Sequence, residues 1–500
     1  MRRFLTVWLA IALGSVSLGA AAPAGASEVV IGRPASTTGM DPGFLREAAT
    51  LVDNIFDTLV LRDSHMTLVP GLALSWTPVD DTTWEFKLRP GVTFQDGEPF
   101  DAAAVKFTLD RVLDPAAKAP TISYIRTIKS VDVVDPLTVR IATKAPDPLL
   151  PTRMSRYPAY IVPPAYVTQV GQAAFARKPI GTGPYKVTEF VPDDHVTMVA
   201  NPNYWRGKPA IDTVIWRPIP DATARIAALL AGEVQLIEGV PVELVPAVAN
   251  SGQADIVRVP YGGLTVYLGL KSAEKPLDDV RVRRALSMAI DREGIVKEIL
   301  KGYATVTGTQ VGPFDFGYKP VAPPAYDPKA AKALLAEAGY PDGFAIRMQV
   351  PRRYISSAEV GQAIAQQFAA IGVKADLEVP EWSVYQQQVP AGKQAPIYML
   401  AWGSTQTLDA DAALFAILRS GEPYSTVALP ALDTLLDQSR ATIAPAARSE
   451  VFAKIQDLDA AEVPLLTLYG EDAVYAKSRA VVFTGRPDAR IPVFDIRLNE

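Results

Sequence analysis

The sequence predicts an α/β protein with more than one packed unit, and three observations carry this prediction. Short strands and capped helices alternate along the whole chain, with no internal repeat of about 20 to 50 residues. Hydrophobic residues make up 49% of the 500 positions, which is enough for two or more cores. The 43 prolines exceed ordinary usage and indicate stiff loops, because the chain is too hydrophobic to be disordered.

The first predicted elements lie between residues 84 and 113. A half-buried strand is expected at 84–89, where three apolar residues alternate with three charged residues before the turn Pro90-Gly91. A helix is expected after Asp101, whose side chain is a natural N-cap, with apolar residues four apart as far as Leu113. This order of elements predicts a sheet with a covering helix.

Three further helices show the same signals, a capping residue or proline at the start and a glycine at the end. They are predicted between Asp221 and Gly232, between Asp327 and Gly339, and from 358 to Gly372. Alternating apolar residues predict strands after the first and the third helix, at 234–236 and 373–379.

Composition excludes several classes of function. With 49 basic against 54 acidic residues, the net charge of -5 leaves no electrostatic footprint for nucleic acid. The chain has no cysteine, which excludes disulfides, thiol catalysis and cysteine-based zinc sites. The two histidines, His65 and His195, are too far apart for a paired-imidazole metal motif. We therefore expect no cofactor and no metal site.

Residues 1–26 are predicted to be a secretory signal peptide. Arg2 and Arg3 precede a short apolar run, and Ala24-Gly25-Ala26 is an A-x-A cleavage site, so we expect cleavage after Ala26. Nothing later in the chain approaches about 18 consecutive apolar residues. A lipid anchor would need a cysteine at the cleavage point. We therefore expect a periplasmic protein without a lipid anchor.

Seven stretches of the chain carry distinctive sequences in a fixed order. They are Leu68–Trp76, Trp84–Phe94, Asp96–Asp110, Gly181–Tyr185, Asn201–Pro209, Val282–Arg292 and Asp327–Gly339. Together they resemble the family 5 extracellular solute-binding proteins of bacterial ABC importers, a family that includes dipeptide, oligopeptide, glutathione and nickel-chelate binders. The resemblance extends over almost all of residues 28–497.

The resemblance implies a two-lobed periplasmic-binding-protein fold of the class II type, cluster C, with an extra α/β subdomain. Lobe I would comprise 27–60, 180–268 and 470–500, the extra subdomain 61–179, and lobe II 269–469. The hinge is then expected near Leu268–Lys271 and Leu466–Gly470. Gly269 and Gly470 would absorb the change of backbone angle when the lobes close.

The resemblance also implies a ligand-carboxylate site at Arg352 and Tyr354, in the segment Met348–Tyr354 that follows a predicted strand. An arginine holds a carboxylate through two parallel hydrogen bonds, which a lysine does not reproduce. The alternative interpretation of Arg352 is an exposed residue at the end of a strand, as expected for Arg353.

Three more residues are candidates for ligand binding. The family resemblance makes Trp402 a wall of the cleft, with core packing as the alternative. Asp409 is a candidate partner for a ligand amine, although Asp409 and Asp411 are equally plausible caps of a following helix. The loop 403–408 between Trp402 and Asp409 has no charge, so a plain dipeptide ligand is not the only solute to consider. Met40 is expected at the cleft edge of lobe I, contributing backbone groups.

The predicted function is that of a receptor that captures a peptide or peptide-like solute between its lobes and delivers it to the permease and ATPase subunits of an ABC importer. Alternatives are a receptor for an opine, an oligosaccharide or a nickel chelate. An exported hydrolase is the alternative of another class, but the chain has no G-x-S-x-G, and its single S-x-x-K, Ser272–Lys275, lacks the companion motifs. We expect a monomer that is not an enzyme.

Overall fold

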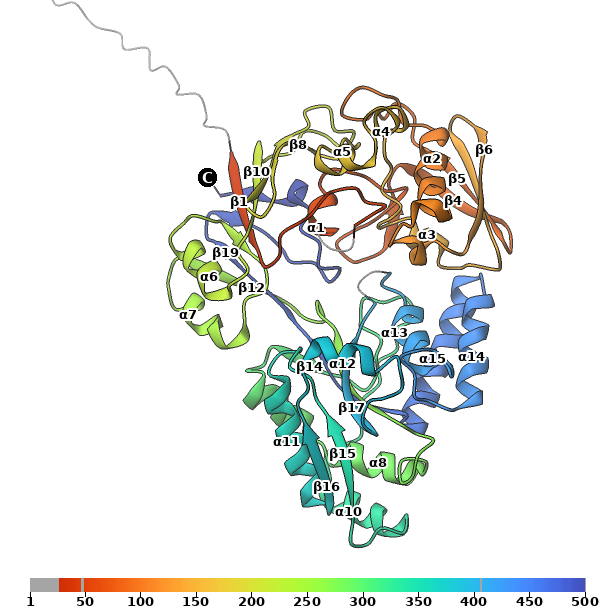
Figure 1. Ribbon diagram of the computed structural model, residues 1–500, viewed down its shortest axis with the longest axis vertical. Helices are drawn as coiled ribbons and strands as arrows, with labels where there is room; N and C mark the ends of the chain where they lie inside the picture. The colour runs from red at the N-terminus through yellow and green to blue at the C-terminus, as the bar shows by residue number, and fades with distance from the viewer. Residues whose placement is uncertain (1–26, 46–48, 405–406, 500) are drawn as a thin grey trace, which may run out of the picture.

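The computed structural model describes residues 27–45, 49–404 and 407–499, so the predicted signal peptide lies outside the described residues. Two large sheets organise the described chain, and each is the centre of one lobe (Figure 1). Lobe I contains the seven-stranded sheet together with a smaller four-stranded sheet, and lobe II contains the six-stranded sheet. The mixed sheets with covering helices confirm the predicted α/β class.

The seven-stranded sheet of lobe I has the order β12-β19-β11-β1-β10-β9-β8. β1 is parallel to β10 and β11, whereas the other pairs are antiparallel. Val29 and Ile31 contribute to one hydrophobic core and Val30 to another, so both faces of β1 are covered. Its strands are β1 (Glu28–Arg33), β8 (Tyr185–Val191), β9 (His195–Ala200), β10 (Thr213–Pro218), β11 (Leu236–Ile237), β12 (Ala254–Val259) and β19 (Ala473–Ser478), and its helices are α1 (Ala49–Val52), α4 (Pro164–Val170), α5 (Gln172–Arg177), α6 (Ala222–Leu230) and α7 (Val245–Ala249).

The four-stranded sheet forms the subdomain of lobe I and is antiparallel, with the order β4-β5-β7-β6. The strand predicted at 84–89 is β5, and the helix predicted after Asp101 is α2, which is capped by the Asp101 carboxylate. The elements of the subdomain are β2 (Val60–Arg62), β3 (Leu68–Pro70), β4 (Ala73–Asp80), β5 (Thr83–Leu88), α2 (Ala102–Leu113), β6 (Ile128–Asp135), β7 (Thr138–Thr143) and α3 (Leu150–Arg153). A short pair, β20 (Val481–Val482) and β21 (Arg497–Leu498), completes lobe I.

The six-stranded sheet of lobe II has the order β14-β18-β13-β17-β15-β16. One face packs against α8, α10 and α11, and the other against α12 to α15. The strands are β13 (Thr265–Leu270), β14 (Ala304–Val306), β15 (Phe344–Gln349), β16 (Val373–Glu378), β17 (Ile397–Trp402) and β18 (Leu465–Glu471). The helices are α8 (Val280–Met288), α9 (Arg292–Gly294), α10 (Pro328–Glu337), α11 (Ser357–Ala370), α12 (Trp382–Gln388), α13 (Ala410–Leu418), α14 (Pro430–Ala441) and α15 (Pro445–Glu462).

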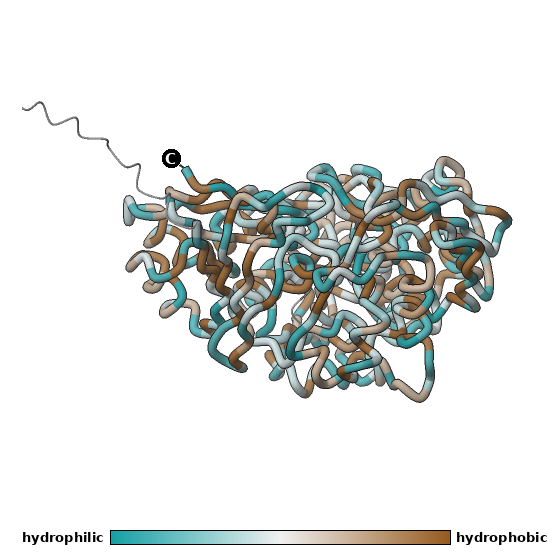
Figure 2. Tube along the Cα trace, turned by 90° about the horizontal axis from the view of Figure 1, so that it is seen from above, coloured by the Kyte–Doolittle hydropathy of each residue, from teal (hydrophilic) through white to brown (hydrophobic). Residues whose placement is uncertain are grey.

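The three further helices predicted from the sequence are present. They are α6, α10 and α11, and the Asp221 and Asp327 side chains accept hydrogen bonds from the backbone at the starts of α6 and α10. Along the chain, hydrophobic and hydrophilic stretches alternate over short distances, as Figure 2 shows.

Among the described residues, no helix combines the length and hydrophobicity needed to cross a membrane.

The chain passes between the two large sheets at residues 260–264 and at Asp472. The segments predicted as the hinge, 268–271 and 466–470, instead lie mostly within β13 and β18, two neighbouring strands of lobe II. Around the crossings, Gly263 N donates to the Glu471 carbonyl at 3.0 Å and Glu471 N donates to the Leu264 carbonyl at 2.8 Å. The two crossing segments are therefore hydrogen-bonded to each other.

The two glycines predicted to act as hinge residues have a packing role instead. A Cβ atom at Gly269 would lie 2.2 Å from the ring of Tyr398, which is fully buried in lobe II. A Cβ atom at Gly470 would lie 2.4 Å from the ring of Tyr261. These positions need glycine because an aromatic ring occupies the space of the missing side chain.

We predict that Gly269→Ala lowers the free energy of unfolding by about 1 to 3 kcal/mol, because the added methyl group overpacks a closed core. Gly312→Ala is the control, since a Cβ atom there meets only the Asp315 carboxylate, at an ordinary contact distance of 3.4 Å. Urea unfolding of the two variants measures the difference. Equal stability of both variants would show that the core accommodates the methyl group.

Candidate functional site

Two neighbouring pockets lie between the lobes. The larger, which we call the subdomain pocket, has a volume of about 430 Å³. Its lining residues come from the subdomain of lobe I (Arg62, His65, Met66, Thr67, Leu68, Trp76, Trp84, Pro148, Pro151 and Thr152) and from lobe II (Pro313, Phe314, Asp315, Phe316, Leu408, Asp409, Ile443, Pro445 and Arg448). Because both lobes line it, this pocket changes shape whenever the lobes move relative to each other.

The smaller pocket, which we call the hinge pocket, lies beside the chain crossing at 260–264. It has a volume of about 20 Å³, and its walls are formed by Tyr261, Gly263, Thr265, Gln310, Gly312, Phe314, Asp315, Gly403, Ser404, Leu408 and Pro487. Phe314, Asp315 and Leu408 line both pockets. The two pockets are therefore parts of one interlobe cleft.

Asp315 lies where the two pockets meet, and the sequence patterns did not single it out. Its carboxylate accepts hydrogen bonds from the Ser404 hydroxyl and from Gly312 N, the latter at 2.8 Å. Burial raises the pKa of Asp315 to about 6, although these hydrogen bonds oppose the shift. A carboxylate offers about four acceptor positions, so Asp315 keeps acceptor capacity for a ligand.

Gln310 gives the hinge pocket a second acceptor. Its Nε2 donates to the Thr467 hydroxyl at 2.8 Å, whereas its buried Oε1 has no hydrogen-bond partner in the described part of the chain. A buried carbonyl oxygen without a partner carries a desolvation penalty that a donor on a ligand would relieve.

Arg62 links the subdomain to lobe II. One terminal nitrogen donates to the Met66 carbonyl at 2.6 Å, and the other donates across the cleft to the Thr407 carbonyl. Burial lowers the pKa of Arg62 to about 10. The guanidinium therefore stays charged at neutral pH and spans the boundary between the lobes.

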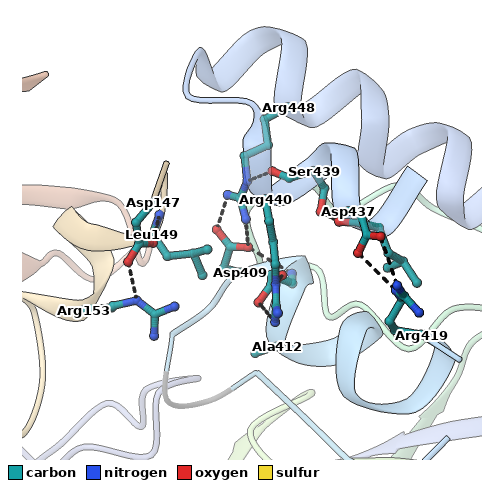
Figure 3. Close-up of polar contacts among 12 residues, drawn as sticks. Asp147, Leu149, Arg153, Asp409, Ala412, Arg419, Asp437, Ser439, Arg440 and Arg448 are labelled. Carbon is teal, nitrogen blue, oxygen red and sulfur yellow. Dashed lines mark hydrogen bonds and ion pairs between the residues drawn. The ribbon is translucent and has the colours of Figure 1, made fainter. Parts of the chain in front are cut away.

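Asp409 lies in the wall of the subdomain pocket, but Arg448 occupies its carboxylate. The Arg448 guanidinium donates to both oxygens, at 2.6 and 2.8 Å, and both side chains are almost fully buried (Figure 3). Asp409 also caps α13 by accepting from Asp411 N at 3.0 Å. Asp411 is paired with Arg440 in the same manner, at 2.6 and 3.0 Å. In this structure both aspartates hold α13 to α14 and α15, and neither is free for a ligand amine.

Arg352 and Tyr354 follow the end of β15. Because β15 is parallel to β17 and its last residue pairs with Tyr398, the chain leaves β15 in the direction of Trp402, toward the edge from which the chain crosses to lobe I. The side chain of Arg352 is exposed. Tyr354 is half-buried, with its ring edge-to-face against Trp382 at 6.1 Å, and burial raises its pKa to about 12. The structure thus brings Arg352, Tyr354 and Trp402 to one edge of lobe II.

Trp402 and Met40 are engaged within their own lobes. The Trp402 indole Nε1 donates to the Ala412 carbonyl at 2.8 Å, and its ring lies 4.9 Å from that of Tyr424. Met40 is fully buried in the core of lobe I, and its N–H donates to the Ala176 carbonyl at 2.8 Å. Met40 lines neither the subdomain pocket nor the hinge pocket.

Glu471 is a second buried acid that the sequence patterns did not single out. It stands at the end of β18, beside the crossing to lobe I, and Ile355 N donates to its carboxylate at 3.0 Å. Burial raises the pKa of Glu471 to about 7, against the opposing effects of that hydrogen bond and of the Arg353 charge. The chain crossing and the segment that carries Arg352 therefore meet at this carboxylate. No group of three or more potential metal ligands occurs among the described residues.

Comparison with known proteins identifies the family. Residues 67–425 match the model of the middle region of the bacterial extracellular solute-binding proteins, family 5. The chain belongs to this family. It is 32% identical to the glutathione-binding protein GsiB of Salmonella paratyphi A over 495 residues, which cover 96% of each chain. This finding confirms the family that the sequence motifs resemble.

Two solved structures superpose on almost the whole chain. HbpA2 from Haemophilus parasuis has a TM-score of 0.87 and 24% identity, with 95% of this chain and 100% of HbpA2 covered. The periplasmic binding protein DppA from Helicobacter pylori, in complex with the peptide STSA, has a TM-score of 0.74 and 25% identity, with 95% of this chain and 98% of DppA covered. The predicted two-lobed periplasmic-binding-protein fold is thereby confirmed.

We predict that Glu471→Gln stabilises the protein at high pH but not at low pH. The folded pKa of about 7 lies above the ordinary value of 4.5, so the wild-type stability from this group is fully present below about pH 4.5 and is lost as pH rises to about 7. Glutamine keeps an acceptor oxygen but never ionises. The variant should therefore gain about 2 to 3 kcal/mol over wild type between pH 4.5 and pH 8.

Urea unfolding at both pH values measures this gain. Glu359→Gln, an exposed position on α11, is the matched control and should show no comparable change. A pH-independent difference between Glu471→Gln and wild type would contradict the raised pKa.

Proposed function

We propose that this family member captures a peptide or peptide-like solute between its lobes and delivers it to the permease of an ABC importer. The observation that carries the proposal is the cleft itself, whose walls come from both lobes. The glutathione-binding relative and the peptide-bound neighbour support the choice of solute class. Family members are binding proteins, and we propose that this chain likewise returns its solute chemically unchanged.

The proposed mechanism is closure of the lobes around the solute. Residues 260–264 and Asp472 are the hinge in this proposal, because the chain leaves one large sheet for the other at these positions. Only contacts that form preferentially in the closed state favour closure. A shift from 1:99 to 99:1 takes about 5.5 kcal/mol, which a few polar contacts made by both lobes can supply.

We assign the charged ends of the solute to different parts of the lobe II edge. Arg352, with Tyr354 beside it, binds the carboxylate, and Trp402 lies in the adjoining wall. Asp315 and the unpartnered Gln310 oxygen accept from the ammonium or amide groups. Asp315 replaces Asp409 in this role, because the carboxylate of Asp409 is already neutralised by Arg448.

We further propose that the protein acts in the periplasm as a monomer, released after Ala26 and free of a lipid anchor. The permease and the ATPase subunits of the importer are its protein partners in this proposal. The family supports a location outside the cytoplasm.

A ligand screen tests the solute class. Solutes that co-purify are identified by mass spectrometry, and thermal shift is then measured with short peptides, glutathione, opines and nickel chelates. A ligand at 100 times its Kd contributes about 2.7 kcal/mol to stability, so a peptide or glutathione should raise the Tm clearly. Stabilisation by an opine or a nickel chelate alone would reject the peptide class, and chemical conversion of the ligand would indicate an enzyme.

We predict that Arg352→Ala weakens binding of the ligand so found by about 30-fold to several-thousand-fold, the usual cost of about 2 to 5 kcal/mol for truncating one partner of a charged pair. The Tm without ligand should change by no more than a few degrees, because Arg352 is exposed. Calorimetry measures the affinity. Arg347→Ala, an exposed arginine on the preceding strand β15, is the control and should bind like wild type. Equal affinity of Arg352→Ala and wild type would remove Arg352 from the site.

A further inference from the structure

The wall of the subdomain pocket carries more aromatic side chains than that of the hinge pocket. Most of its wall is apolar or aromatic, from Met66, Leu68, Trp76, Trp84, Pro148, Pro151, Pro313, Phe314, Phe316, Leu408, Ile443 and Pro445. A cavity of about 430 Å³ with such walls favours an uncharged, hydrophobic occupant.

The charged residues in this wall already have partners inside the protein. Arg448 and Asp409 neutralise each other, and Arg62 donates to the Met66 and Thr407 carbonyls. Asp315 accepts from Ser404 and Gly312, at the end of the pocket that adjoins the hinge pocket. A charged solute group beside Asp409 and Arg448 would lose its hydration and meet two charges that already compensate each other.

The lobe II wall of the pocket is held rigidly. Phe316 N donates to the Leu408 carbonyl at 2.9 Å, and Ala410 N donates to the Phe316 carbonyl at 2.9 Å. The Phe316 ring lies edge-to-face against Phe452 at 6.3 Å, beneath the Arg448 guanidinium at 5.3 Å. Even so, Phe314 and Phe316 remain 39% and 36% exposed. A large aromatic side chain held at a concave surface in this way offers a contact face to a ligand.

The opposite wall is equally well fixed. Trp84 lies in β5 of the subdomain, and its indole Nε1 donates to the Asp147 carbonyl at 3.2 Å. Asp147 in turn accepts from Arg153 at 3.1 Å and from Leu149 N at 3.0 Å, on the side that faces Asp409 and Arg448 in Figure 3. Aromatic rings from both lobes thus line one cavity, and contacts within the protein hold them in place without a ligand.

We propose that the subdomain pocket is a second subsite of the cleft, which takes an aromatic or bulky apolar substituent of the solute whose polar end lies in the hinge pocket. The two pockets adjoin at Phe314, Asp315 and Leu408, which is why we assign one molecule to both. The solute class is then a peptide or peptide conjugate with a large apolar side group. This inference rests on the proposed function and makes its substrate class narrower.

Matched pairs of probes test the inference on the mature protein. The pairs are glutathione with S-benzylglutathione, and Ala-Ala with Ala-Phe, each measured by calorimetry. Within a pair that binds, the aromatic member should bind about 10-fold to 100-fold more tightly, because it buries a ring that the smaller member lacks.

Substitutions in the wall locate the effect. Trp76→Ala and Phe316→Ala, at two positions that line the subdomain pocket but not the hinge pocket, should remove the preference for the aromatic member while leaving the affinity for the small member unchanged. Phe316 is partly exposed, so its truncation keeps the test valid if Trp76→Ala fails to fold. Val79→Ala, on the same strand as Trp76 but 52% exposed and outside the pocket, is the control and should keep the full preference.

The outcomes separate this inference from the proposed function. Equal affinities within a binding pair, or a wall variant that weakens both members equally, would overturn the inference, since the aromatic wall would then be only a contact of lobe closure. The receptor for a peptide-like solute would survive that result. If neither pair binds while an opine or a nickel chelate does, the proposed peptide class fails and the inference falls with it.

Discussion

The geometry of the molecule depends on the two places where the chain crosses between its large sheets. Residues 260–264 and Asp472 run side by side and are tied by backbone hydrogen bonds on both sides of Glu471. The buried carboxylate of Asp472 is paired with Arg258 and accepts from Tyr261 N at 3.3 Å. These hydrogen bonds hold the two crossing segments together and so fix where the lobes are joined. The surfaces of the lobes that face each other remain free to form a cleft.

The charged groups around the cleft fall into two kinds. In the first kind, a carboxylate is fully compensated by a guanidinium, as Asp409 is by Arg448. Such a pair fixes α13 against α15, but it has little left to offer a ligand, because a desolvated ion pair satisfies its own charges. In the second kind, a buried acid has, among the described residues, only hydrogen-bond donors or a distant charge, as Asp315 and Glu471 do, and burial raises its pKa. Acids of the second kind gain most from a cationic or donor group on a solute.

Several features of the fold follow from local sequence. Helix caps at Asp101, Asp221 and Asp327 and the alternating strand 84–89 are visible in the sequence, because a cap or a period of two involves neighbours in the chain. The motifs from Leu68 to Gly339 also resembled the family to which the chain belongs. The placement of Arg352 and Tyr354 after the end of a strand was likewise predictable, since both come shortly after an apparent strand in the sequence. The five predicted site residues nonetheless end in different places, with Met40 inside lobe I and Asp409 paired.

The sequence by itself determined several helices and strands with their capping residues, and the family of two-lobed binding proteins to which the chain belongs. Only the tertiary structure decided which acids remain available to a solute, because the relevant partners are remote in the chain. Asp409 is paired with Arg448, and Asp315 is hydrogen-bonded to Ser404, in both cases with a partner that is distant along the chain. Gly269 is needed because the ring of Tyr398 packs against it, and not because the backbone bends there. The free energy of a charge or a close contact depends on what lies beside it in space, and the order of residues alone does not specify those neighbours.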